Sequence, residues 1–261
     1  MKLENLYNDL QSKMSDDKFS RRDALNKAGD FGIKAAIAAL PFALSALFTK
    51  SLKAQSTPSI VEVLNFALTL EYLEAAFYER GLNFNPALIP AADRTIFTQI
   101  GKHEDAHVVT LRSTITTLGG TPVSSPTFDF TGGGAFPDVF TNYATFLALS
   151  QSFEDTGVRA YKGQAGNLIS NDAVLTAALQ IHSVEARHAS EVRRLRSQKG
   201  WITQANTGGA PAAIYDRENN TIQGGINVST ITTVSSDAIT EAFDETLTMA
   251  EVLAIADPFI V

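Results

Sequence analysis

The stretch IGKHEDAHVVTL (residues 100–111) is the most informative part of the sequence, and it allows two interpretations. Taken as His-Glu-x-x-His, it is typical of a zinc metalloprotease helix, in which His103 and His107 bind zinc and Glu104 is the general base. Taken one residue later, it is Glu-x-x-His, and Glu104 and His107 form one part of a carboxylate-bridged two-metal site in a helical bundle. The remainder of the chain decides between the two interpretations.

Composition excludes several classes of function. The chain has 261 residues, of which 44% are hydrophobic, and this is enough for a domain with a substantial core. Its net charge of −7 leaves no basic excess to neutralise phosphates, so nucleic acid is not an expected partner. The absence of cysteine excludes thiolate metal sites, thiol catalysis and disulfides. Only four histidines are present, so a metal site must depend largely on carboxylates.

Residues 1–54 are predicted to be an export signal and linker rather than part of the fold. An arginine pair in FSRRDALNKAGD (19–30) precedes the apolar run FGIKAAIAALPFALSALF (31–48), which a polar stretch of small residues follows. The segment SRRDAL is similar to a twin-arginine signal, although Ala24 occupies a position that is usually aromatic. We therefore expect an exported, periplasmic protein. The alternative is an uncleaved segment through which the protein associates with a membrane.

Hydrophobic periodicity and helix-breaking residues predict four helices after this segment. The predicted helices are 58–82, 91–120, 141–168 and 173–200. A stretch rich in Pro, Gly and Ser (121–138) separates the second helix from the third and predicts one long connection. Residues 55–200 are thus expected to form an all-α four-helix bundle with a single crossover between helices 2 and 3.

The C-terminal extension (201–261) differs from the predicted bundle in its sequence pattern. Its first half is irregular in pattern, and two segments near the end, 235–245 and 248–260, are predicted to form short helices. The second of these begins with a capping box, because Thr248 is followed three residues later by Glu251. We expect the extension to pack on the bundle.

The four helices carry an internal repeat. A helix with Glu-x6-Tyr is followed by a helix with Glu-x2-His, and the pair then occurs a second time. The members are Glu71, Tyr78, Glu104 and His107 in the first copy, and Glu154, Tyr161, Glu185 and His188 in the second. Because each glutamate lies on the apolar face of its helix, duplication of a two-helix unit explains the pattern.

Six members of the repeat are predicted metal ligands: Glu71, Glu104, His107, Glu154, Glu185 and His188. Bridging carboxylates offset the repulsion between two neighbouring cations, and an imidazole completes the coordination of each. Four buried glutamates without a cation would carry a large electrostatic cost. Tyr78 and Tyr161 are the candidate catalytic residues, expected to hydrogen-bond the ligating carboxylates or to quench oxidising equivalents, and the alternative is that they are ordinary core tyrosines. Glu74, one turn after Glu71, is an alternative ligand.

These motifs resemble those of the ferritin-like superfamily over residues 58–200. The segments that carry the resemblance are LNFALTLEYLEAAFYERGL (64–82), HEDAHVVTLR (103–112), FEDTGVRAY (153–161) and VEARHASEVRRLR (184–196). They are similar to the bacterial ferritin-like domain branch, which includes desiccation-related proteins. The resemblance implies a bundle in which two helices each supply a glutamate, and the other two each supply a Glu-x-x-His, to two iron or manganese ions.

The resemblance also implies an activity. Members of this superfamily oxidise Fe(II), or react with O2 or peroxide, so a ferroxidase or manganese-catalase-like oxidoreductase in stress protection is expected. Small molecules would be the partners, and a homo-oligomer the expected assembly. The alternative is a non-catalytic ferritin-like stress or envelope protein. The zinc-protease interpretation leaves Glu71, Glu154 and the second Glu-x-x-His unexplained.

The remaining charged residues near the motifs have less specific interpretations. His103 is expected to lie on the helix face or to contact a ligand rather than to bind metal itself. His182, one turn before Glu185, is either a partner that orients a ligand or a half-buried histidine. Asp155 is predicted to be solvated, and so are the basic residues that end the fourth helix, Arg193, Arg194, Arg196 and Lys199.

Overall fold

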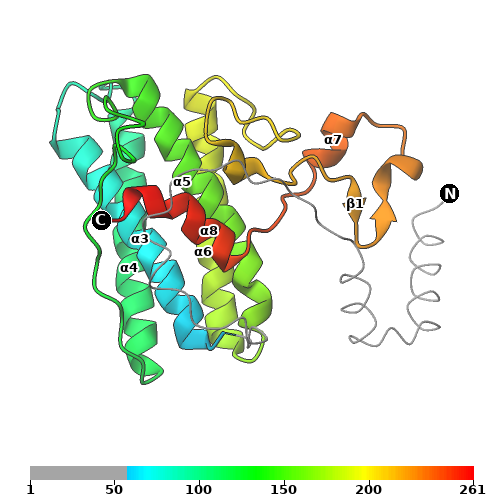
Figure 1. The fold of residues 1–261 in the computed structure, drawn as a ribbon, viewed down its shortest axis with the longest axis horizontal. Coiled ribbons are helices and arrows are strands. Elements are labelled where there is room, and N and C mark those ends of the chain that lie inside the picture. Colours follow the sequence, from blue (N-terminus) through cyan, green and yellow to red (C-terminus); the bar gives the residue numbers. More distant parts are fainter. Residues whose placement is uncertain (1–57) are drawn as a thin grey trace. The chain divides into compact units, whose positions relative to one another are not determined.

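The computed structural model describes residues 58–261 and shows a bundle of four long helices (Figure 1). The helices are α3 (Ile60–Asn83), α4 (Arg94–Thr117), α5 (Tyr143–Gln164) and α6 (Asp172–Leu195). The prediction of an all-α four-helix bundle is therefore confirmed. The predicted export segment, residues 1–54, lies outside the described residues. Across residues 58–261, no helix is long and apolar enough to cross a membrane.

Local sequence signals set the ends of the helices. The Ser59 hydroxyl accepts from the backbone N–H of Glu62, whose carboxylate accepts from the backbone N–H of Ser59, so a capping box begins α3. Helix α4 begins at Arg94, slightly later than predicted, because hydrogen-bonded turns precede it. Helix α6 ends at Leu195 and not near residue 200, since Ser197 adopts a positive φ of 57° that no helix accommodates.

The helices are arranged as two pairs joined by the predicted crossover. Helix α3 packs against α4, and α5 packs against α6. The connection, residues 118–142, runs along the outside of the bundle (Figure 1). The C-terminus holds it in place, because Asp129 donates its N–H to the Phe259 carbonyl and Val261 donates to the Thr127 carbonyl, both at 2.9 Å. The last residues of the chain thus fix the longest loop of the bundle.

Two apolar clusters fill the bundle. One is rich in aromatic side chains, in which the Phe77 and Phe146 rings stack with centroids 4.9 Å apart. The other is mainly aliphatic and includes Leu68 and Ile115. Along α3 the aliphatic cluster ends at Tyr72 and the aromatic cluster begins at Leu73, directly after Glu71, which is itself completely buried. A polar layer therefore interrupts the core where the repeat places its glutamates.

The extension contains short elements: η2 (Ala212–Tyr215), β1 (Ile222–Gln223), β2 (Ile226–Asn227), η3 (Val228–Thr230), α7 (Ser236–Thr240), α8 (Met249–Ala256) and η4 (Asp257–Phe259). The antiparallel pair of β1 and β2 is an addition to the predicted short helices. The predicted capping box of Thr248 and Glu251 opens α8. Helix α8 lies across α3 and α5, where Val252 and Ala256 pack against Phe66 (Figure 1). The domain boundary at residue 200 stays a prediction.

The extension approaches α5 very closely. A Cβ atom on Gly163 would lie 2.0 Å from the carbonyl oxygen of Leu247, so this position accepts only glycine without a backbone shift. The N–H of Leu247 donates to the Arg159 carbonyl at 3.3 Å, and the completely buried Arg159 side chain pairs with Glu218 at 2.9 Å. The extension is therefore attached to the bundle by polar contacts as well as by apolar packing.

The prediction that Asp155 and Arg193 are solvated is wrong. Both are buried, and Arg193 Nη2 lies 2.5 Å from Asp155 Oδ2. Tyr215 in the extension covers this pair and donates its hydroxyl to Asp155 at 2.7 Å. Arg196 is partly buried beside them and donates to Gln151 at 2.5 Å. Helical periodicity assigns these residues to the outer face of the bundle, but the extension covers that face.

Candidate metal centre

The structure brings all six predicted ligands together in the polar layer of the bundle. Glu71 comes from α3, Glu154 from α5, and each Glu-x-x-His pair from α4 or α6. The four glutamates are completely buried, and His107 and His188 are buried as well. Each side chain points inward because the i, i+3 spacing within a pair keeps both members on one helical face. The predicted residues thus form one cluster.

Within residues 58–261, two sets of four side chains are arranged so that each could hold a cation. The first set is Glu71, Glu104, His107 and Glu185, and the second is Glu104, Glu154, Glu185 and His188. In the first set, His107 Nδ1 lies 3.1 Å from Glu71 Oε2, 3.0 Å from Glu104 Oε2 and 3.1 Å from Glu185 Oε1. In the second, His188 Nδ1 lies 2.9 Å from Glu104 Oε1, 3.3 Å from Glu154 Oε2 and 3.2 Å from Glu185 Oε2.

Glu104 and Glu185 belong to both sets, and they divide their oxygens between them. Each carboxylate directs one oxygen toward His107 and the other toward His188. Glu71 faces only His107, and Glu154 faces only His188. The cluster therefore has an internal two-fold arrangement, with two bridging carboxylates and one terminal carboxylate for each histidine.

The atoms in each set fit a cation better than they fit one another. A single imidazole nitrogen carries at most one proton, so it cannot donate to three carboxylates at once. Atoms that each lie about 2.1 Å from one ion are separated by about 3 Å, as the atoms here are. Several buried atoms have no hydrogen-bond partner in residues 58–261, namely Glu104 Oε1, Glu154 Oε2, both oxygens of Glu185 and His188 Nδ1. Two divalent cations would also neutralise the four carboxylates.

The pKa values of the clustered side chains indicate that the cluster favours positive charge. Burial raises the pKa of Glu71 to about 7, although the hydrogen bond with His107 lowers it. Burial also raises the pKa of Glu154, against the opposing effect of His188. Burial lowers the pKa of His107 and His188, but the surrounding carboxylates outweigh it and raise both to about 12. A cation that binds here would therefore displace protons from the imidazoles.

Tyr78 and Tyr161 connect the two halves of the repeat. The Tyr78 hydroxyl on α3 donates to Glu154 Oε1 on α5, and the Tyr161 hydroxyl on α5 donates to Glu71 Oε1 on α3. Each tyrosine therefore contacts the terminal carboxylate of the other half, and leaves the second oxygen of that carboxylate directed at a histidine. Both tyrosines are buried, which restricts the carboxylates they contact to one orientation.

Glu74 lies outside both sets, although it is buried next to them. In the internal repeat Glu74 corresponds to Gly157, three residues after Glu154. A Cβ atom on Gly157 would lie 3.2 Å from Glu74 Oε1, so the glycine leaves room for this carboxylate. Burial and the neighbouring carboxylates, Glu185 first among them, raise the pKa of Glu74 well above its usual value. The geometry favours Glu71 over Glu74 as the ligand from α3.

His103 contacts a predicted ligand. Its Nδ1 lies 2.8 Å from Nε2 of His188, and the two rings stack with centroids 5.1 Å apart. When Nδ1 of His188 faces a cation, its Nε2 carries the proton and donates to His103. The other ring nitrogen of His103 lies 2.7 Å from the amide nitrogen of Gln99, one turn earlier on α4. His103 is in neither set, so the structure does not support the zinc-protease interpretation.

His182 does not reach the centre. Its ring faces α5, where it forms a hydrogen bond with the backbone of Val158. Burial lowers the pKa of His182, although this hydrogen bond raises it. It belongs to neither set of possible ligands in the described residues. Of the two interpretations of His182, the structure favours the half-buried histidine without a role at the centre.

Comparison with known proteins agrees with this architecture. The family model described as ferritin-like domain matches residues 59–198 of the chain. The chain belongs to the ferritin-like domain family. The matched range contains all four long helices and both sets of side chains that could hold a cation in this ferritin-like domain. No protein among the curated sequences matches the chain.

Proposed function

We propose that this ferritin-like protein holds two iron or manganese ions and is an oxidoreductase that reacts with O2 or peroxide. The observation that carries the proposal is the division of the Glu104 and Glu185 oxygens between two four-residue sets. Carboxylates and imidazoles together suit iron and manganese, and both metals accept more than four ligands. Open positions would thus be left for a small substrate.

The residues of the chain have distinct parts in this proposal. Glu104 and Glu185 would bridge the ions and balance their charge. Glu71 and Glu154 would each bind one of the two ions as a terminal ligand. Tyr78 and Tyr161 fix the terminal carboxylates by hydrogen bonds, and the apolar clusters on both sides limit the access of water. When bound, a pair of such ions would supply one electron each to reduce peroxide and two protons to two waters, and a second peroxide, oxidised to O2 and two protons, would return the two electrons. With O2 as the oxidant, Fe(II) itself would be the substrate.

The proposal includes where the protein acts. The arginine pair and the apolar run in residues 19–48 support export, with a periplasmic location. The resemblance to the branch with desiccation-related proteins supports a role in stress protection. A homo-oligomer is the proposed assembly, and light scattering of the purified protein would measure it. An uncleaved N-terminal segment would be the one route to membrane association in this proposal.

The test begins with the metal content of the purified protein, followed by titration of metal-free protein with Fe(II) and Mn(II) under anaerobic conditions. We expect two ions per chain, and then consumption of O2 or peroxide by the loaded protein. The variant Glu104→Gln should lose metal and activity, whereas Asp105→Asn, which changes the neighbouring exposed carboxylate, should keep both. Zinc as the native metal, with peptidase activity that depends on Glu104, would instead identify a protease.

The same measurements separate the proposal from its main alternative. A chain that binds two ions but turns over neither O2 nor peroxide would be a non-catalytic ferritin-like protein. A chain that binds no iron, manganese or zinc would overturn the metal centre itself. Mineral uptake into a large shell would indicate iron storage.

A further inference from the structure

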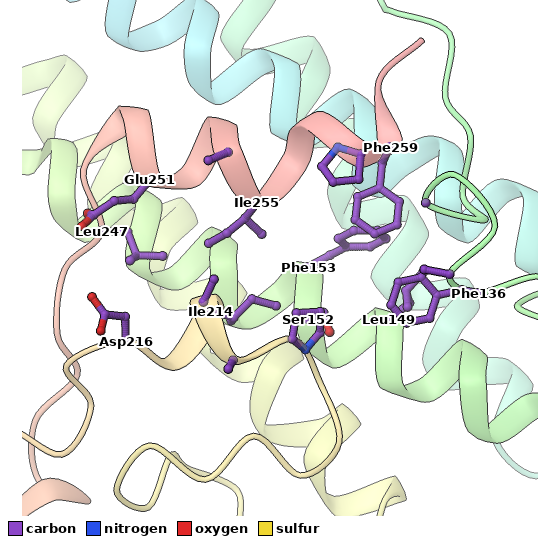
Figure 2. A pocket seen from close by; sticks show the side chains of 17 residues that line it. Phe136, Leu149, Ser152, Phe153, Ile214, Asp216, Leu247, Glu251, Ile255 and Phe259 are labelled. Carbon is purple, nitrogen blue, oxygen red and sulfur yellow. The ribbon is translucent and has the colours of Figure 1, made fainter. Parts of the chain in front are cut away.

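A large cavity lies beside the bundle, beneath α8 (Figure 2). It has a volume of about 710 Å³, is partly open to solvent, and is lined by the crossover, α5, the turn around η2 and α8. Its walls are mainly hydrocarbon, supplied above all by Phe136, Leu149, Phe153, Ile214, Ile255 and Phe259 (Figure 2). Cavities of this size and lining hold small organic molecules in other proteins.

A second, much smaller hollow lies behind the inner wall of the cavity. It has a volume of about 10 Å³, enough for a single small group, and it shares Phe153 and Ile255 with the large cavity. Its other walls include Leu70 and Leu73 of α3, and Gly157 of α5. Two side chains therefore separate the large cavity from a hollow that reaches between α3 and α5.

The small hollow ends beside the candidate metal centre, although no residue of the two ligand sets lines it. Glu74 is part of its wall, and Glu74 Oε1 lies 3.2 Å from the point that a Cβ on Gly157 would occupy. The Cγ atom of Glu185, which belongs to both sets of possible ligands, lies 3.6 Å from the same point. The internal repeat is broken on this side, with Gly157 in α5 at the position that corresponds to Glu74 in α3.

The charges around the cavity restrict what it can bind. Among its lining residues, all within the described part of the chain, the charged ones are Asp216 and Glu251. Arg217 pairs with both carboxylates, at 2.7 Å each, so neither is free to hold a cationic group. An anionic head group would meet acidic residues and no free basic residue on the lining. An ion such as Fe(II) would lose its hydration without finding ligands on these hydrocarbon walls.

We propose that this cavity binds an uncharged molecule that is mainly hydrocarbon and leads it toward the di-metal centre past Phe153 and Ile255. The inner end of this route rests on the proposed function, whereas binding in the cavity does not. Movement of the two shared side chains would join the hollows, since Ile255 is only partly buried on the short helix α8. The contact of the small hollow with Glu74 then brings the bound molecule beside the ligand cluster.

Equilibrium dialysis with the full chain tests the binding step, with radiolabelled 1-dodecanol and dodecanoate as probes. We expect dodecanol to bind at one molecule per chain and dodecanoate to bind at least about tenfold more weakly. Ala254→Trp fills the cavity from α8 and should weaken dodecanol binding at least about tenfold. Leu253→Trp is the matched control, because Leu253 is the neighbouring exposed residue and does not line the cavity.

Three outcomes would overturn the binding step. They are no binding of dodecanol, equal effects of Ala254→Trp and Leu253→Trp on binding, and binding of dodecanoate as tight as that of dodecanol. A change of oligomeric state in Ala254→Trp alone, measured by light scattering, would assign this face to a second copy of the chain and would also overturn the proposal.

Proton relaxation of bound dodecanol tests the connection to the centre. The protein is loaded with Mn(II), which is paramagnetic, or with Zn(II), which is not. We expect faster relaxation of the dodecanol protons in the Mn(II) protein only, and equal relaxation in the two would overturn the route. If elemental analysis finds no bound metal, the proposed function fails and the route with it, whereas the dialysis result still decides the binding step.

Discussion

Glu154 and Asp155 are neighbours on α5, and both are buried, yet their surroundings are opposite. Asp155 faces Arg193 at 2.5 Å and accepts a hydrogen bond from Tyr215. Glu154 faces only His188 among basic side chains, and three further glutamates complete its cluster. No lysine or arginine of residues 58–261 pairs with any of these four glutamates.

The difference shows how a buried carboxylate can be assigned a role. The Asp155 cluster contains its own cation, so it is complete within the protein and holds the extension on the bundle. The glutamate cluster has more negative than positive charge and several unpaired oxygens, so it is incomplete without cations from outside. Burial alone does not separate the two, because both carboxylates are buried and only the cations beside them differ.

Removal of a shared carboxylate should have the largest effect on the centre. Glu185→Gln is expected to abolish binding of both ions, since Glu185 belongs to both sets. The metal-free variant should unfold at the same temperature or higher, because one of four like charges is removed. Elemental analysis and thermal unfolding measure the two effects. Glu71→Gln is the control and should lose one ion only; full metal binding by Glu185→Gln would contradict the assignment.

Removal of the carboxylate that pairs with Arg193 should have the opposite effects, with metal binding kept and stability lowered. Asp155→Ala is expected to keep both ions but to lower the free energy of unfolding by about 3–5 kcal/mol, because it leaves Arg193 buried without a partner. Urea denaturation measures the loss. In the double variant Asp155→Ala/Arg193→Leu neither charge is left unpaired, so the loss should be smaller. An equal or larger loss in the double variant would show that the pair is not the cause.

Loss of the histidine that contacts His188 should have an intermediate effect. His103→Ala removes the partner of His188 Nε2, and we expect metal affinity at the second set to fall by about 10–100-fold. His182→Ala is the matched control and should leave affinity unchanged, since His182 faces α5. Calorimetric titration with Mn(II) measures both. Equal affinities for the two variants would mean that His103 only packs against the centre.

The smallest effect concerns the exposed link between Arg217 and α8. Hydrogen bonds from Arg217 lower the pKa of Glu251 from its usual value near 4.5 to about 2. A carboxylate whose pKa is lower in the folded state than in the unfolded state stabilises the fold at pH values above its unfolded-state pKa. That stabilisation is lost as the pH falls toward 2. Because the pair is partly exposed, less than about 1 kcal/mol is expected.

Glu251→Gln tests this link, because glutamine keeps the capping box and removes only the charge. Denaturation of both proteins from pH 6 to pH 2 gives the difference in free energy of unfolding. The difference should shrink as the pH approaches 2. A difference that stays constant over this range would assign the effect to the cap and not to the ion pair.

Most of the bundle and the composition of the site could be predicted from the sequence. Helix faces are local properties, set by spacings of three, four and seven residues, so they place Glu71 and the Glu104–His107 pair on inward faces. The duplicated pattern identifies which glutamates belong together. Helix ends shifted by a few residues, because turns at Arg94 and Ser197 depend on backbone angles that the hydrophobic pattern does not record.

The sequence by itself determined four helices, one crossover and a cluster of four glutamates with two histidines. The tertiary structure alone decided that Glu104 and Glu185 are shared and that each tyrosine contacts the carboxylate of the opposite half. It also decided that the extension buries Asp155 and forms one side of the cavity. The physical reason is that periodicity fixes the direction of a side chain relative to its own helix. Which atoms meet depends on how the helices and the extension pack against one another.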